Sequence, residues 1–183
     1  YLLQSDIDQF DAYRNKIDDE INGGTYELFE LTNKVIVQRI DDCKAFYADL
    51  LEKPFDFAKD ENVELDPEKL DYAKTSDELK ERWRLVMKYQ TLQKLATKID
   101  LNEKAKNNND TILEVKTFEQ MEQESREKLR EEYDRIFKRL AKIEEEDRRE
   151  VYLNSITNVF DPHTTYMAPE DKKQFDINMS GRL

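Results

Sequence analysis

The sequence is poor in glycine, proline and cysteine. Its 183 residues include only three glycines, four prolines and one cysteine. Average proteins contain about 7% glycine and about 5% proline, so this chain has few tight turns and favours long, uninterrupted helices. The single cysteine, Cys43, excludes an internal disulfide and a cysteine-rich zinc site. Its position in an apolar helical pattern predicts a buried thiol.

Residues that build active sites are also scarce. His163 is the only histidine, which excludes a metal site made of several histidines and a catalytic cysteine–histidine pair. Gly23, Gly24 and Gly181 cannot form a phosphate-binding loop, and the nucleophile pattern Gly-x-Ser-x-Gly is absent. The serines mostly lie in helical or capping contexts. We therefore predict no catalytic, cofactor-binding or metal-binding residue in this chain.

Long apolar runs and excess positive charge are absent as well. No run approaches the ~20 apolar residues of a membrane helix, so no membrane span is predicted. The formal net charge is -12 at pH 7, and a surface of that sign repels phosphate backbones, which argues against nucleic acid as a partner. With 42 acidic residues, carboxylate pairs arise by chance. A small enzyme using carboxylates alone would need a cleft with two acids of strongly displaced pKa.

Apolar residues recur at steps of three and four, which predicts an all-α fold, an irregular bundle of five to six helices. The first helix should run without a break to Gly23 and Gly24. Two later helix starts carry capping-box sequences. These are Thr75 with Glu78, and Thr117 with Gln120. The remaining apolar stripes run from Phe29 to Leu50, Leu79 to Ile99, Leu129 to Ile143 and Val151 to Phe160.

Other stretches lack an apolar face and divide the chain. Residues 54–74 are expected to form an ordered loop or a short extended pair, and the polar residues 101–116 an exposed linker. Residues 1–160 then constitute the helical domain. Residues 161–183 form a junction with an extended C-terminal tail.

Phe55 and Phe57 are the aromatic residues of the first connector. They follow Pro54 in a stretch without helical spacing. Aromatic side chains exposed on a loop can anchor a protein partner, whereas buried ones would hold the loop against the bundle. Both interpretations remain open at this stage, and both residues are candidates for contact with a partner.

The stretch from Asp161 to Pro169 crowds rigid, polar and aromatic residues together directly after a helix. Asp161 and Thr164 can bond nearby backbone amides, and the two prolines stiffen the path. Tyr166 and Met167 can pack against the helix. The residue types therefore predict an ordered turn.

This stretch closely resembles the D-P-H-[ST]-x-Y-[LM]-x-P segment of tail-specific, or carboxy-terminal processing, proteases of the Prc/Tsp type. In that family the segment stands just before a PDZ domain. Three further segments resemble the family in the same order along the chain. They are Ser5–Phe10 (S-D-I-x-x-F), Glu52–Phe57 (E-K-P-F-D-F) and Gln174–Ser180 (Q-F-x-x-x-M-S).

The resemblance spans nearly the whole chain and covers only the N-terminal helical region of that family. It implies that a PDZ domain, which captures the C-terminus of the substrate, and a protease core with a Ser–Lys catalytic pair lie elsewhere in the parent protein. No residue here matches either part, so no catalytic role is carried over. The family is exported to the bacterial envelope, which implies a periplasmic location and a signal peptide outside this chain.

We therefore predict the non-catalytic N-terminal helical domain of a periplasmic C-terminal processing serine endopeptidase. Its role would be to frame the PDZ and protease domains, help enclose protein substrates and offer a docking face to an adaptor or a second protomer. The alternative is a free-standing helical interaction module, in which the stripe from Leu129 to Ile143 forms a homotypic pair. The junction would consist of Asp161, Pro162, His163, Thr164, Tyr166 and Met167.

Overall fold

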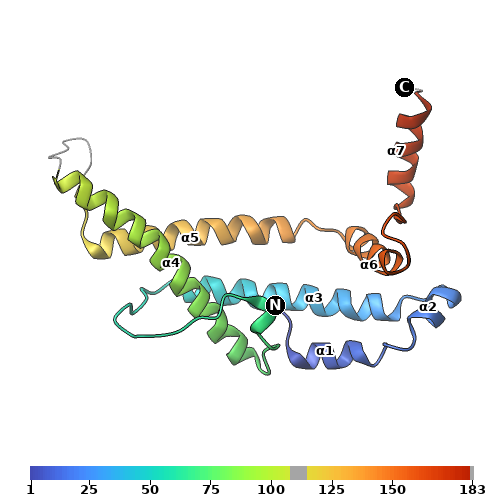
Figure 1. The fold of residues 1–183 in the computed structure, drawn as a ribbon, viewed down its shortest axis with the longest axis horizontal. Coiled ribbons are helices and arrows are strands. Elements are labelled where there is room, and N and C mark those ends of the chain that lie inside the picture. The colour runs from blue at the N-terminus through green and yellow to red at the C-terminus, as the bar shows by residue number, and fades with distance from the viewer. Residues whose placement is uncertain (108–114, 182–183) are drawn as a thin grey trace.

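The computed structural model describes residues 1–107 and 115–181, and within them it confirms an all-α fold. The molecule is elongated: α4 crosses α5 at one end, and α6 and α7 lie at the other (Figure 1). One isolated bridge pairs Leu3 with Ala73. The α-helices are α1 (Gln4–Asp11), α2 (Ile17–Gly23), α3 (Glu27–Leu50), α4 (Ser76–Asn107), α5 (Phe118–Leu140), α6 (Glu145–Phe160) and α7 (Pro169–Ser180).

Both predicted capping boxes mark helix starts. The Gln120 amide donates to Thr117 Oγ1 at 3.3 Å, and the Thr117 amide donates to Gln120 Oε1 at 2.9 Å. The Glu78 amide donates to Thr75 Oγ1 at 3.1 Å. These side chains satisfy amides that lack partners in the first turn of a helix, which fixes where α4 and α5 begin.

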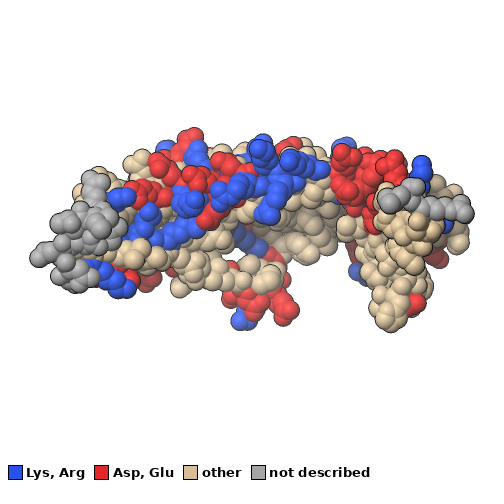
Figure 2. Space-filling model, turned by 90° about the horizontal axis from the view of Figure 1, so that it is seen from above, with Lys and Arg blue, Asp and Glu red and all other residues tan. Residues whose placement is uncertain are grey.

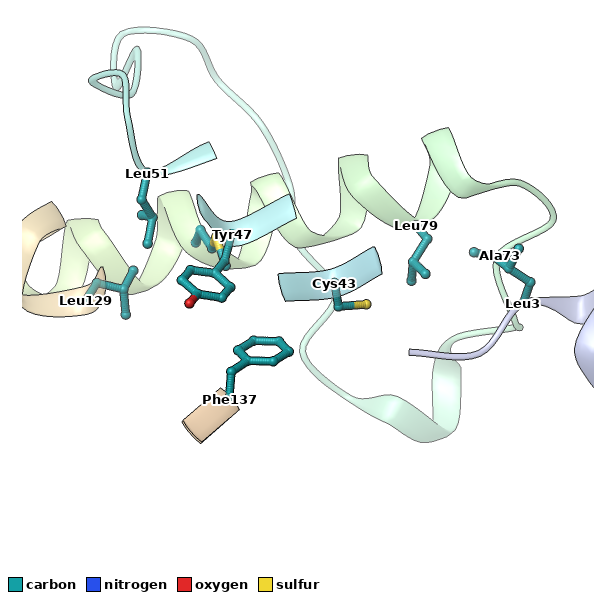
Figure 3. Packing of buried hydrophobic residues seen from close by; sticks show 9 residues of the cluster. Leu3, Cys43, Tyr47, Leu51, Ala73, Leu79, Leu129 and Phe137 are labelled. Carbon is teal, nitrogen blue, oxygen red and sulfur yellow. The ribbon is translucent and has the colours of Figure 1, made fainter. Parts of the chain in front are cut away.

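The core lies where α3, α4 and α5 pack together (Figure 3). The Tyr47 ring stacks on Phe137 with a centroid distance of 4.9 Å and on Tyr133 at 5.6 Å. The Tyr47 hydroxyl donates to Asp134 Oδ1 at 2.6 Å, and burial raises the pKa of Tyr47 to about 12. Cys43 is fully buried as predicted, and burial raises the pKa of its thiol to about 11.

The expectation of one unbroken first helix is wrong, because the chain turns at residues 12–16 between α1 and α2. On α1, Asp6 pairs with Arg39 of α3; on α2, Glu20 accepts from the Leu28 amide at 3.3 Å. In a straight helix Asp6 and Glu20 would lie about 21 Å apart, whereas their partners on α3 are separated by about 16 Å. The break lets both contacts form.

The expected linker is also corrected in its first half, because α4 continues through residues 101–107. Ala105 is buried there, and the Asn102 side chain bonds both backbone groups of Lys116, with N···O distances of 2.9 and 3.0 Å. Leu, Ala, Lys and Glu supply five of these seven residues and favour a helix, and the contacts between α4 and the entry to α5 stabilise it further. The rest of the expected linker up to residue 114 lies outside the described residues.

The expected extended tail is helical over α7. Pro169 occupies the first turn, where its missing N–H costs no hydrogen bond, and Glu170 and Asp171 follow it. Gly181 ends the helix with a φ of 60°. The helix stands away from the bundle at the C-terminal end of the chain (Figure 1).

Residues 54–74 form an ordered connector, as expected, with one 3-10 turn, η1 (Pro67–Lys69). Glu61 fastens it to α4. Its carboxylate accepts from Lys88 Nζ at 2.7 Å and from both terminal nitrogens of the Arg84 guanidinium, the longer contact being 3.2 Å. These cations, with the hydrogen bonds from Arg84 first, hold the pKa of Glu61 far below its usual value. Ion pairs with α4 thus hold the middle of the connector in place.

Candidate interdomain and docking surfaces

The predicted junction begins at the last turn of α6 and forms a compact turn around Asp161. Asp161 Oδ1 accepts from the His163 amide at 2.9 Å, and Oδ2 accepts from Thr164 Oγ1 at 3.1 Å. The Thr164 amide donates to the Asp161 carbonyl at 3.0 Å. The turn is self-contained, and the exposed His163 contributes its backbone to it.

Asn154 fastens the junction to α6. Its Nδ2 donates to the Tyr166 carbonyl at 3.1 Å, and its Oδ1 accepts from the Tyr166 amide at 2.7 Å. The two bonds reproduce the pairing of an extended strand and fold the chain back along α6 before α7 begins. Sequence reasoning missed Asn154; a polar residue between the apolar positions Tyr152 and Ile156 was the available signal.

Large apolar side chains are exposed on both sides of this junction. On α6, Val159 is 81% exposed and Phe160 is 84% exposed. On α7, Met179 is 72% exposed, and Phe175 is nearly half exposed. Single exposed apolar residues are ordinary, but several near one junction mark a surface suited to contact with another protein part.

Most side chains of the stripe from Leu129 to Ile143 pack against other parts of the same chain. Leu129 and Phe137 are buried, and Tyr133 and Leu140 pack against the same core. The alternative hypothesis pairs this stripe with the same stripe of a second copy, which requires its side chains to be exposed. Because most of them are already packed within the chain, that helix pairing is wrong. Of the named stripe, Ile143 is 41% exposed.

Hydrogen bonds to the ionised form explain the shifted pKa values of carboxyl groups among the described residues. The pKa of Asp6 and that of Glu61 are both lowered, chiefly by hydrogen bonds from arginine side chains. Hydrogen bonds to the ionised form produce this direction, and it is typical of structural ion pairs rather than of a general acid. Among the residues that the structure describes, no group of His, Cys, Asp and Glu could hold a metal, and no helix has the length and apolarity to cross a membrane.

A family model of the tail-specific protease N-terminal domain matches residues 1–170. The chain belongs to this family. The match starts at Tyr1 and ends just after Pro169 opens α7, so it includes the whole junction turn and the bundle.

A curated relative is the tail-specific protease of Haemophilus influenzae, strain ATCC 51907 / DSM 11121 / KW20 / Rd. It is 27% identical over 182 residues, which cover 98% of this chain and 23% of the relative. The chain therefore spans about a quarter of the length of that protease. Together with the family match, this places the chain among the tail-specific protease N-terminal domains.

Phe55 and Phe57 lie half-buried against the bundle. Phe55 packs on the core cluster, and its amide donates to Glu122 Oε1 at 3.3 Å. The Phe57 ring lies 6.3 Å from Phe55 and 6.5 Å from Phe118, measured between centroids. Both residues hold the connector in place, and their contact with a partner remains a prediction.

The first family-like segment contains Asp6, a structural residue that sequence reasoning did not single out. The Arg39 guanidinium donates to both Asp6 oxygens, at 2.8 and 2.9 Å, and the Leu3 amide donates to Oδ2 at 2.8 Å. The Asp6 side chain is only 3% exposed. A buried carboxylate bound by a two-pronged cation fixes the position of α1 on α3.

Proposed function

We propose that this chain is the non-catalytic N-terminal helical domain of a larger, periplasmic C-terminal processing endopeptidase of the serine type. The domain frames the PDZ and protease domains of the parent chain and helps to enclose protein substrates. It also offers a docking face to an adaptor or a second protomer. Family membership and the fourfold greater length of the relative support this proposal.

The observation that carries the proposal is the apolar surface beside the clamped junction. Val159 and Phe160 are each more than four-fifths exposed at the end of α6. Covering one such side chain with another domain contributes about 1.5 to 3 kcal/mol. The Asn154 clamp holds the following chain at a defined place beside this surface, which suits an interface between domains.

The test replaces Val159 and Phe160 by serine in the complete parent protease. We expect cleavage of a protein substrate to slow by about tenfold, because contacts at the centre of an interface carry most of its energy. The same double change in this 183-residue chain should leave its melting temperature unchanged, since both side chains are already exposed.

The matched control carries Ile36→Ser and Val37→Ser, two apolar residues exposed on α3 away from the junction. It should cleave like the natural protease. Unchanged cleavage, substrate affinity and hydrogen-exchange protection in the Val159→Ser, Phe160→Ser protease would contradict the framing role.

A further inference from the structure

The C-terminal end of α5 and the turn after it carry a group of exposed cations with no acidic residue between them in the sequence. Residues 135–143 contain no Asp or Glu. Arg135 reaches Glu131 only at 3.9 Å, and Lys138, Arg139 and Lys142 form no ion pair within the described residues. By contrast, Lys94 and Lys98 on α4 are paired with acids of α5. We call Arg135, Lys138, Arg139 and Lys142 the basic patch.

An acidic group follows directly in the chain at the start of α6. Glu144, Glu145, Glu146 and Asp147 are all exposed, and within the described part of the chain Glu145 alone of the four pairs with a cation, Arg149, at 2.7 Å. We call these four residues the acidic patch. On the face seen from above, a group of basic side chains at the end of α5 adjoins a group of acidic ones at the start of α6 (Figure 2).

Local effects explain part of this arrangement. Cations in the last turn of a helix and acids in the first turn of the next are favoured by the helix dipoles. That effect is confined to the terminal turns, and it does not require four exposed cations of which three form no ion pair with a described residue. Arg135 lies outside the last turn of α5, and the hollow lined by Glu132, Arg135, Ile136, Lys138, Arg139 and Lys142 has a volume of about 590 Å³.

We propose that the two patches bind a second copy of this chain. Charge complementarity selects this occupant, since a basic group and an acidic group lie side by side on one face (Figure 2). A two-fold axis lying in that face, between the patches, sets each basic patch on the acidic patch of the other copy. In an isologous dimer of this kind the same contact forms twice, and each basic patch lies against an acidic patch.

An apolar residue sits between the patches. Ile143 separates Lys142 from Glu144 in the sequence and is 41% exposed. Close to the two-fold axis it meets Ile143 of the second copy, which places an apolar contact at the centre and charges around it. This inference rests on the docking role proposed above and names its partner. The scaffolding role does not depend on it.

The experiment is sedimentation of this chain as a function of concentration and salt. We expect a monomer–dimer equilibrium that weakens by about tenfold or more as the salt is raised from about 0.05 M to about 0.5 M, because surface charges are screened over such a range. A chain that stays monomeric at low salt and high concentration would overturn the inference.

A charge swap provides the sharper test. One variant carries Lys138→Glu and Lys142→Glu, and the other carries Glu144→Lys and Glu146→Lys. Each pair of changes brings one patch to zero net charge, so each variant alone should be monomeric. An equimolar mixture should form dimers, because the unchanged basic patch of one variant faces the unchanged acidic patch of the other, and the exchanged side chains face one another with opposite charge. The control carries Lys34→Glu and Lys44→Glu, at two exposed lysines of α3 that form no ion pair with a described residue. It makes the same charge change as the first variant and should dimerise like the natural chain.

Circular dichroism and the fluorescence of Trp83 establish that each variant is folded. Failure of the folded mixture to dimerise, or dimers that persist in either variant alone, would overturn the proposed surface. These experiments measure no protease activity, so their outcomes do not bear on the scaffolding proposal. That proposal is tested with the Val159→Ser, Phe160→Ser protease.

Discussion

Several contacts between single residues of this domain are buried or half-buried ion pairs and the hydrogen bonds beside them. Asp6 and Arg39 join α1 to α3, Glu122 and Arg126 pair on α5 at 2.9 Å, and Arg126 also donates to the Leu51 carbonyl at 2.8 Å. Surface ion pairs contribute little to stability, but a pair shielded from water leaves an unpaired charge when one partner is removed. Asp6 is therefore the residue whose loss is expected to matter most.

The first prediction concerns Asp6→Asn. The change leaves the half-buried Arg39 with a weaker partner, so the free energy of unfolding should fall by about 3 kcal/mol. Urea titration followed by the fluorescence of Trp83, the only tryptophan, measures it. Asp8→Asn, two residues away and exposed, serves as the control and should change stability by less than about 0.5 kcal/mol. Equal effects of the two changes would refute the anchoring role.

At the scale of elements, the ends of helices are set by a few side chains rather than by the average character of a segment. Thr117 and Gln120 start α5, and the residues around Pro169 start α7. Between α6 and α7, the Asn154 clamp sets the path of the chain. The orientation of α7 therefore depends on one amide side chain more than on packing.

The second prediction concerns Asn154→Ala. Loss of two hydrogen bonds, each contributing about 1 kcal/mol, should raise local opening of residues 161–168 by about thirtyfold. Hydrogen exchange of the Tyr166 amide, or the rate of limited proteolysis in this turn, reports the change. Asn158→Ala is the matched control, because Asn158 is exposed on the same helix. Similar protection of the Tyr166 amide in the two variants would contradict the role of Asn154 as a clamp.

At the scale of the whole molecule, the fold depends on ionised carboxylates. Glu61, Asp6, Glu78 and Glu124 all have a lowered pKa because cations or amides bind the charged form. A group with a lowered folded-state pKa contributes stability above its unfolded pKa and loses that contribution as the pH falls towards the folded value. Stability should therefore decline as the pH falls below about 4.5.

The third prediction follows from Glu61. The melting temperature of the natural chain should fall steeply between about pH 4.5 and about pH 3, whereas Glu61→Gln should start lower at pH 7 and fall less steeply. The reason is that the variant has no carboxylate at position 61 to protonate. Glu68→Gln removes an exposed carboxylate of the same connector and should retain the natural slope. If the melting temperatures of the natural chain and of Glu61→Gln fell in parallel with pH, Glu61 would not contribute to the pH dependence of stability.

Much of the fold follows from local sequence, because local patterns act over one or two helical turns. The four-residue spacing, both capping boxes, the buried Cys43 and the turn at Asp161 were all predictable in this way. The break between α1 and α2 was not, since it depends on the distance between Arg39 and Leu28 on another helix. The Asn154 clamp was also missed, because its partner lies 12 residues further along the chain.

The sequence by itself determined an all-α chain without a recognisable active site and, through its four family-like segments, its membership of the tail-specific protease N-terminal domains. Only the tertiary structure decided which charged side chains form ion pairs within the molecule and which face solvent. Lys88 and Arg84 face Glu61, whereas Lys138 and Arg139 face solvent, although all four lie on regular helices. A one-dimensional pattern records which residues are charged, but pairing depends on distances of a few ångströms between segments far apart in the chain.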